Sequence, residues 1–599
     1  MENNDLLEPC KLYSTSLKQS HHERVEKYFD DLKKLSGVDI SANKETCSRY
    51  YAKENELKKI SKKIAGRHSL KIFLIVLAII GGLLILFGAL GLAFANNQVI
   101  GIPLLIVGIC LTIGSLLIIF LVVRPGTKKL EAACRKLEEE CQKLMDEAYS
   151  QMASLNSLFD SEVPAKLFEE TCPLLDLDRT FTKQRYECLL NKYGYRGVGD
   201  SHHSVLGVIS GSILGNPFCL VKEKKEEMRP HTYVGTLVIT WTTRVSNGKG
   251  GSYTVTHTQT LTAEVIKPRP EYDDTLTLIY GNEAAPNLEF SRQMSNISSM
   301  NDKEIARYVS KHEKDLTKMS EKAMKKGGTY TPLGNAEFEL FFGGLDRNNE
   351  VEYRLLFTPL GQKSMLDLMK SKDGYGDDFN FRKMKMINKV HSAHSQCFDY
   401  FVDESYFTHF DFEVIEKRFI EYNDTYFKSL FFDFAPLLAI PLYQQHKSHE
   451  YIYKDTIKSN ITEIEHEVIA NKYNPTYFAH KDTSTQVILK TEFVKDHNGA
   501  DIVRVVAHSF KEIPHIEVVP KLGGDGRMHG VPVTWYEYQP LKNSKDIEIL
   551  DLNVSILDYN KKKPSDEALR VFSRGLYSEA LGANKLNIDV NSLKEKMHK

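Results

Sequence analysis

The sequence predicts a membrane α-helical hairpin and a coiled-coil-like stalk that carry a cytoplasmic α+β domain with antiparallel β-sheets. Three observations predict this fold class: a long uncharged stretch, a heptad pattern directly after it, and alternating β-type runs further along the chain. The expected segments are an N-terminal cytoplasmic helical region (1–71), the hairpin (72–123), the stalk helix (124–170), a β-rich subdomain (177–360), an aromatic-rich helical subdomain (361–480), a second β section (481–560) and a C-terminal tail (561–599).

The membrane hairpin is predicted from the stretch between Ile72 and Val123, which contains no Lys, Arg, Asp or Glu although 26% of the chain is charged. The polar turn Asn96-Asn97-Gln98 divides this stretch into helices over 72–95 and 98–123. A helix of about 24 residues reaches about 36 Å, which is enough to cross the hydrocarbon of a bilayer. No apolar run follows the first residues, so we expect no cleaved signal peptide.

The flanks of the hairpin predict its orientation. Basic residues precede the first span and follow the second, while the connecting loop has no charge. The positive-inside bias therefore predicts a two-span protein of the cell membrane with both termini in the cytoplasm. The same side chains are expected to contact the headgroups of the lipid bilayer. They are Lys58, Lys59, Lys62, Lys63, Arg67, Lys71, Arg124, Lys128 and Lys129.

Small residues recur every seven positions in both spans. They are Gly81, Gly88, Ala95, Gly101, Gly108 and Ser115. If the chain folds back about Gln98, they pair as 81 with 115, 88 with 108 and 95 with 101, which would let the two backbones approach closely. The alternative interpretation is that glycine is simply common in membrane helices.

The stalk is predicted from apolar residues that alternate steps of three and four after the second span. They are Leu130, Cys134, Leu137, Cys141, Leu144, Ala148, Leu155 and Leu158, with Gln151 as the one polar break between Ala148 and Leu155. The expected partner is the helix that approaches the first span through Leu57, Ile60 and Ile64, which would make an antiparallel stalk. Homo-oligomerisation through the same seam is the alternative.

The rest of the chain predicts β-hairpins and helices. Runs at 232–245 and 253–266 flank a turn at 246–251, and a threonine-rich face of the second run is expected to be exposed. Further hairpins are expected at 204–225, 337–357 and 486–510, with more strands at 516–519 and 533–538, and a helix is expected at 362–372. Residues 204–221 are uncharged, but Pro217 and the glycines argue against a third span.

The region from 384 to 427 is predicted to be rich in helix, with an aromatic stripe that packs in the core. The stripe comprises Phe412, Ile415, Phe419, Tyr422 and Tyr426. The apolar segment 430–443 is too short to span a bilayer, so we expect it to be buried or interfacial.

Three motifs could carry chemistry. Asp176 and Asp178 have the DxDxT spacing of haloacid-dehalogenase-type phosphatases, but not the parallel-strand context. Tyr375-Gly376-Asp377-Asp378 matches a polymerase hairpin and is expected to be a surface turn. His391, His394 and Cys397 could bind zinc, yet on a helix Ile387, Val390, His394 and Cys397 would form an apolar core stripe. No catalytic residue, cofactor or metal is assigned.

Charge and cysteines limit the function classes. The chain has 78 Lys and Arg against 79 Asp and Glu, so nothing favours nucleic acid as a partner. The nine cysteines are dispersed, which is typical of reduced thiols. The sequence therefore favours a membrane-anchored, non-enzymatic binding or scaffold protein with a cytoplasmic protein partner or a homo-oligomer. The alternatives are a membrane-bound metal-dependent hydrolase and an oligomeric channel.

The layout also resembles a family. A membrane hairpin, a stalk, the segment from Gly211 to Phe218, the long hairpin 232–266 and the Tyr375-Gly376-Asp377-Asp378-Phe379 turn are similar to uncharacterised bacterial two-span membrane proteins with a large cytoplasmic α+β domain. The resemblance implies a bacterial cytoplasmic membrane, and no activity, cofactor or catalytic residue.

Overall fold

The computed structural model describes residues 8–94, 98–197, 199, 201–246, 252–445, 447–448, 461–497, 500–551, 570–573 and 576–580. These residues belong to two compact units. The helical unit comprises Glu26–Asp160 and Asp403–Tyr422, and the α+β unit comprises Met1–Val25, Ser161–Val402 and Asn423–Lys599. Two helices, α2 (Lys18–Ser36) and α13 (Phe412–Leu438), pass from one unit into the other.

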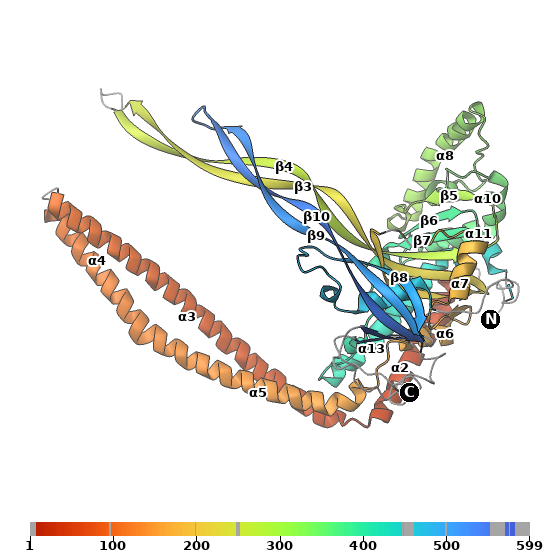
Figure 1. Cartoon of the computed structure of the whole chain (residues 1–599), viewed down its shortest axis with the longest axis horizontal. Coiled ribbons are helices and arrows are strands. Elements are labelled where there is room, and N and C mark those ends of the chain that lie inside the picture. The colour runs from red at the N-terminus through yellow and green to blue at the C-terminus, as the bar shows by residue number, and fades with distance from the viewer. Residues whose placement is uncertain are drawn as a thin grey trace. The chain divides into compact units, whose positions relative to one another are not determined.

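The helical unit is a long two-helix hairpin. One side is α3 (Ile40–Phe94), and the other is the continuous run of α4 (Gln98–Ile118), the π-helical turn η3 (Ile119–Val123) and α5 (Arg124–Asn156). Figure 1 shows α3 running alongside α4 and α5. Pro125 lacks the N–H of a regular helix, so the wider turn at η3 lets the helix continue past it.

Contacts along the hairpin show that its sides are antiparallel. Lys53 forms an ion pair of 3.0 Å with Glu140, and Gln151 Nε2 donates to Thr46 Oγ1 over 3.1 Å. The buried face of α5 carries Cys141, Leu144, Ala148, Met152 and Leu155, close to the predicted heptad seam. Here α5 therefore packs on the helix that leads into the first apolar segment, as predicted for an antiparallel stalk.

The apolar halves of these helices are long and hydrophobic enough to cross a membrane. Only a narrow seam is buried between them, with Leu74, Gly81 and Gly88 on α3 and Gly108 and Ser115 on α4. Most other large side chains of the segment are exposed, including Ile79, Leu83, Phe87, Ile106 and Ile113. The two helices thus contact each other through small residues at seven-residue spacing.

The register of the seam differs from the predicted palindrome. A β-carbon at Gly81 would lie 3.0 Å from Gly108 O and Thr112 N, and one at Gly108 would lie 2.8 Å from Gly81 O. Gly81 and Gly108 therefore face each other, rather than 81 with 115 and 88 with 108. Ala95 lies outside the described residues, and Gly101 lies in α4.

The aromatic stripe of α13 is buried, as predicted. Phe412, Ile415, Phe419 and Tyr422 are each at most 5% exposed in the helical unit, and Tyr426 is 3% exposed in the α+β unit. The second half of the same helix is also buried and ends at Leu438. The apolar segment 430–443 is therefore part of the protein core where it is described.

The first sheet of the α+β unit has seven antiparallel strands in the order β1-β2-β3-β4-β7-β6-β5. They are β1 (Leu175–Leu177), β2 (His203–Ile213), β3 (Asn216–Ser246), β4 (Ser252–Gly281), β5 (Glu289–Arg292), β6 (Phe379–Met384) and β7 (Ile387–Ser392). The hairpins predicted at 204–225 and 232–266 are confirmed and share β3. Leu214 and Gly215 make the tight turn between β2 and β3 with φ values of 49° and 87°.

The second sheet has the order β11-β12-β10-β9-β8. Its strands are β8 (Ile488–His497), β9 (Ala500–Leu522), β10 (Met528–Asp551), β11 (Arg570–Ser573) and β12 (Leu576–Ala580). The second strand of the hairpin predicted at 486–510 and the strand predicted at 516–519 form one strand, β9. The two short strands β11 and β12 lie within the segment expected to be a C-terminal tail.

The hairpin predicted at 337–357 is wrong, because both runs are helical. They form α9 (Ala336–Phe342) and α10 (Glu350–Leu356). The side chains of Asn335 and Asn349 accept hydrogen bonds from the third backbone N–H of each helix, which stabilises helical turns too short for a clear periodicity. The neighbouring helices α8 (Asp302–Lys325) and α11 (Pro359–Lys370) are regular, and α11 confirms the helix predicted at 362–372.

The helical prediction for 384–427 is only partly correct. This region starts with the hairpin of β6 and β7, and helix returns as α12 (Ala393–Gln396) and α13. Ile387 and Val390 are therefore buried on a strand, and no helical stripe joins them to His394 and Cys397. The alternation Phe379-Asn380-Phe381-Arg382 has the period of a strand.

The outer parts of β3 and β4 and of β9 and β10 form two long ribbons that pack face to face, and Figure 1 shows them projecting together. We call residues 231–246, 252–267 and 513–537 the arm. Its inner cluster contains Tyr233, Ile239, Leu261, Val531 and Val533. Gly235 allows the ribbons to meet, because a β-carbon there would lie 2.2 Å from Pro532 O.

Candidate functional site

A groove of about 680 Å³ runs over one face of β4, β7, β6 and β5. Cross-strand pairing sets its floor, because paired residues share a face of the sheet. One row contains Ile279, Lys389, Arg382 and Ser291. The volume is in the range of pockets that hold small molecules.

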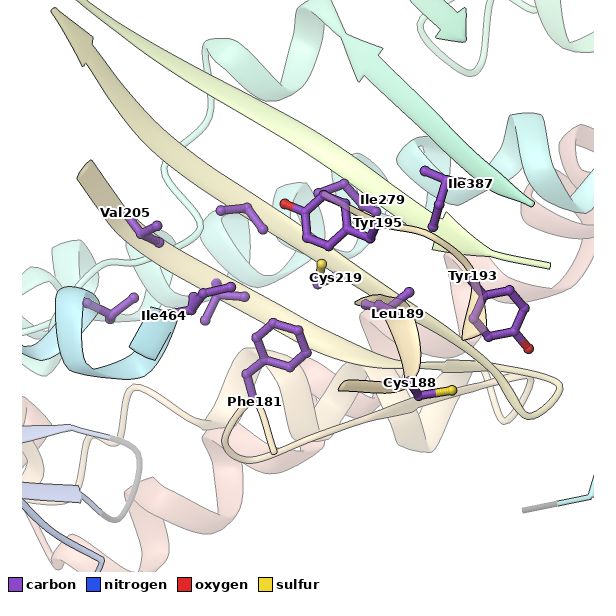
Figure 2. Close-up of a cluster of buried hydrophobic side chains, with 13 residues drawn as sticks. Phe181, Cys188, Leu189, Tyr193, Tyr195, Val205, Cys219, Ile279, Ile387 and Ile464 are labelled. Carbon is purple, nitrogen blue, oxygen red and sulfur yellow. The ribbon is translucent and has the colours of Figure 1, made fainter. Parts of the chain in front are cut away.

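The apolar cluster in Figure 2 covers the neighbouring part of the same face. It includes Ile279 and Ile387 from the sheet, together with Leu189, Tyr193 and Tyr195 from the segment before β2. These covering residues are not among those that line the groove, which include Arg382 and His391, and Tyr195 borders it with its ring centre 5.8 Å from Lys389 Nζ. The groove is therefore the part of this sheet face that the cluster leaves open.

Two cations stand opposite each other on the groove floor. Arg382 on β6 pairs directly with Lys389 on β7, and His391 is the next groove residue on β7. Like charges at directly opposed positions destabilise a sheet. In the described part of the chain, neither Arg382 nor Lys389 forms an ion pair.

Two carboxylates also line the groove. Asp346 accepts hydrogen bonds from the backbone N–H and the hydroxyl of Ser291, at 2.9 and 2.5 Å. Glu289 lies at the edge, one row away from Arg382. Asn380 uses its side-chain oxygen to accept from Met294 N, which leaves its amide N–H₂ as a donor on the floor. The centre of the floor is thus rich in donors, and the acidic groups lie towards its rim.

The opposite face of β5 and β6 packs on α9 and α10, where Phe290 contacts Phe342 and Tyr353. There Arg292 on β5 and Asp377 form an ion pair whose side chains are both 0% exposed, with Nη2–O distances of 2.6 and 2.8 Å. Ser295 donates to the same carboxylate through its backbone N–H and its hydroxyl. Burial lowers the pKa of Arg292, although Asp377 opposes that shift. Asp377 is therefore a buried anchor, and its predicted place in a surface turn is wrong.

Asp378, the next residue, belongs to a second buried network. His394 Nδ1 lies 2.6 Å from Asp378 Oδ2, and His394 Nε2 lies 3.0 Å from the carbonyl of Ser429. Both acceptors require a proton on the ring, so the imidazole holds two. Burial alone would lower the pKa of His394, but Asp378 and the buried Asp433 outweigh it and the pKa is raised.

These contacts decide what His394 can do chemically. A doubly protonated imidazole has no lone pair for a metal and cannot act as a general base. Ser395 donates to Asp433 over 2.6 Å and not to His394, so this network holds no hydroxyl activated by an imidazole. The Tyr375 ring stacks on His394 with ring centres 3.9 Å apart, and both rings are held in place.

The residues considered for zinc point to different places. His391 lines the groove, His394 lies in the buried network and Cys397 is exposed. Over the described ranges of the chain, no three His, Cys, Asp or Glu side chains gather as a metal-binding group. The structure therefore does not bring the three predicted candidates together.

The DxDxT residues also lie outside a phosphatase context. Asp176 is on β1, which pairs antiparallel with β2, and Asp178 forms an ion pair with Arg185 and accepts from Ser210. The groove residues Arg382 and Lys389 were missed in the sequence. The alternation over 379–382 was their signal, because it places Arg382 and Asn380 on the face opposite to two buried phenylalanines.

Comparisons with protein-family models, with curated proteins and with solved structures find no match for this chain. The resemblance to two-span bacterial membrane proteins therefore stays a prediction.

Proposed function

We propose that this chain is a membrane-anchored, non-enzymatic binding or scaffold protein whose α+β unit faces the cytoplasm. The observation that carries the proposal is the exposure of the two apolar helices. Only 17% of the apolar window in the first helix and 22% of that in the second are buried. A helix that is hydrophobic on all sides needs either a protein core or lipid around it. Lipid is the surrounding that we propose for residues 72–94 and 98–123.

The orientation follows from charge. Basic residues lie on both outer flanks of the hairpin: Lys58, Lys62 and Arg67 before the first apolar segment, and Arg124 and Lys128 after the second. This distribution favours a cytoplasmic location for both flanks. The antiparallel contacts of α3 with α5 would then form a coiled-coil stalk below the membrane. The nine cysteines fit a reducing compartment, because those of the described residues are all free thiols.

The hairpin itself supports anchoring better than conduction. The hydroxyls of Thr112 and Ser115 donate to the carbonyls of Gly108 and Leu111 in their own helix. Polar groups that are satisfied in this way do not line a path for ions. An oligomeric channel remains the second candidate, and a chain that forms defined multimers with measurable conductance in bilayers would favour it.

We further propose that the partner presents a phosphate or a carboxylate to the groove. An anion between Arg382 and Lys389 would relieve the repulsion of the opposed cations and accept from Asn380. Among the described residues of the groove, Asp346 holds Ser291 through both its backbone N–H and its hydroxyl, and no imidazole contacts that hydroxyl, so binding rather than hydrolysis is the function that these side chains support.

The anchor is tested by washing cell membranes with alkaline carbonate. We expect the full chain to stay in the pellet. Replacing the exposed Ile79, Leu83 and Leu86 by lysine should release it, because each lysine at the centre of a span costs roughly 3 kcal/mol. The matched variant has alanine at the same positions and should remain in the pellet. Release of the unsubstituted chain would refute anchoring.

The groove is tested by calorimetric titration of the purified full chain with inorganic pyrophosphate. We expect Arg382→Gln with Lys389→Gln to weaken binding at least about tenfold, which is about 1.4 kcal/mol. Lys385→Gln is the matched control, because Lys385 lies in the turn between β6 and β7 and does not line the groove. Equal affinity of the double variant and the control would contradict a role for the opposed cations.

A further inference from the structure

The two outward faces of the arm have different chemistry. On the first ribbon, threonines pair across the strands, as Thr236 with Thr262 and Thr240 with Thr258. On the second ribbon, the outward residues of β9 are Pro514, Ile516, Val518, Pro520 and Leu522, and their partners on β10 are Tyr536, Thr534, Pro532, Gly530 and Met528. The outward rows of the first ribbon mix these threonines with the exposed Val234, Val238 and Ile266, whereas the outward rows of the second ribbon are almost entirely apolar.

Four large side chains of this face are strongly exposed. The exposed fractions are 70% for Ile516, 62% for Val518, 64% for Leu522 and 62% for Met528. We call residues 514–522 and 528–536 on this outward face the apolar stripe. Contiguous exposed apolar surface of this kind marks contact with a partner or a membrane.

Charges at the end of the stripe indicate which partner. Lys521 and Arg527 are the exposed sequence neighbours of Leu522 and Met528 at the turn, with Lys521 in the inward row of β9, and in the part of the chain that is described neither has an ion-pair partner. The nearby acids are engaged within the arm, since Glu517 pairs with Lys267 over 2.9 Å and Asp525 with His529 over 3.0 Å. Apolar side chains next to free cations fit an anionic lipid surface.

The edges of the ribbon argue against strand addition by another chain. Pro514 and Pro520 on β9 and Pro532 on β10 have no N–H to donate. Prolines along an edge strand are a known block to pairing between sheets. An occupant of the stripe must therefore contact it through side chains, as a lipid surface does.

We propose that the apolar stripe is a membrane-contact surface that inserts Leu522 and Met528 among anionic lipids. This inference rests on the proposed function, because the anchor keeps the arm close to a bilayer. The arm would then hold the α+β unit against the membrane at a second point, besides the hairpin.

The chain offers a direct probe of this contact. Its only two tryptophans, Trp241 and Trp535, both lie in the arm next to the inner cluster. With both replaced by phenylalanine, a single tryptophan at Leu522→Trp reports on the stripe. The matched control is Thr258→Trp, on the threonine-rich face of the other ribbon. Each full chain is reconstituted in nanodiscs of phosphatidylcholine, with or without phosphatidylglycerol, and with brominated lipid as quencher.

We expect the tryptophan of Leu522→Trp to lose about half of its emission in brominated discs that contain phosphatidylglycerol, because an interfacial side chain lies within the quencher's short range. Adding Lys521→Gln and Arg527→Gln should remove most of this quenching, and Thr258→Trp should show little. Equal quenching of the two tryptophans, or none at position 522 in an anchored chain, would overturn the proposal.

Three further results separate the alternatives. A blue-shifted emission of Leu522→Trp without quenching, which disappears when each disc holds one chain, would show that a second copy covers the stripe. If the variant with both tryptophans replaced by phenylalanine fails to fold, the quenching of Trp241 and Trp535 is measured in the natural chain and in the double variant Leu522→Gln with Met528→Gln. Equal quenching in these two chains would overturn the proposal. Loss of the full chain from the discs would instead refute the anchor.

Discussion

The buried pair of Arg292 and Asp377 makes a quantitative prediction for Asp377→Asn. Nη2 of Arg292 donates to both oxygens of Asp377 and to the carbonyl of Gln293, while Nε and Nη1 are buried without a hydrogen-bond partner among the described residues. The neutral amide of this variant would leave a buried guanidinium without its counter-charge. Breaking such a pair from one side costs roughly 3–5 kcal/mol.

Pulse proteolysis of the detergent-solubilised full chain in urea measures this cost. For an unfolding slope of about 3 kcal/mol per molar urea, 3–5 kcal/mol lowers the midpoint by about 1–1.7 M. The matched control is Asp546→Asn, which breaks the ion pair with Arg504, whose side chains are 33% and 46% exposed. An exposed pair contributes about 0–1 kcal/mol, so its midpoint should fall by less than about 0.3 M. Equal shifts for the two variants would refute the importance of burial here.

Three other predictions follow from the structure. Gly108→Ala should destabilise the helical hairpin by about 1–3 kcal/mol through overpacking. Gly114→Ala should not, because nothing lies within 4 Å of a β-carbon at that position. Detergent titration of the two variants, with helix content monitored by circular dichroism, compares their stabilities. Burial lowers the pKa of Lys383 to about 7, so above that pH the unfolded chain binds more protons than the folded chain. The free energy of unfolding should therefore rise with pH between about 7 and 10 by up to about 1.4 kcal/mol per pH unit. This rise should vanish in Lys383→Met, and an unchanged slope in that variant would be inconsistent with this cause. Gly235→Val should separate the ribbons of the arm at Pro532 and shift the tryptophan emission to longer wavelength, and an unshifted spectrum would count against that packing.

The parts of the fold with long periodic patterns could be predicted from the sequence. Two apolar helices, the heptad seam of α5 and the hairpin of β3 and β4 all repeat over enough residues to fix the type of element. The seven-residue spacing of Gly81 and Gly88 in one span, and of Gly108 and Ser115 in the other, also identified the contact face. The register of that face could not be predicted, because small residues fit several pairings.

The short elements around the groove were harder. Helices α9 and α10 have seven residues each, so a single capping asparagine outweighs their weak pattern. Asp377 and Asp378 were expected in a turn because charged residues are usually exposed. Their partners Arg292 and His394 lie 85 and 16 residues away in the chain, and only the pairing of β5, β6 and β7 brings them together.

The central claim is that residues 72–94 and 98–123 span a lipid bilayer as a folded-back pair, with the α+β unit on the cytoplasmic side. Protease treatment of sealed membrane vesicles of both orientations, with a tag at the C-terminus, tests it most directly. The account predicts that the tag is digested in inside-out vesicles and protected in right-side-out vesicles. Digestion in right-side-out vesicles, or recovery of the tagged chain in the soluble fraction, would contradict it.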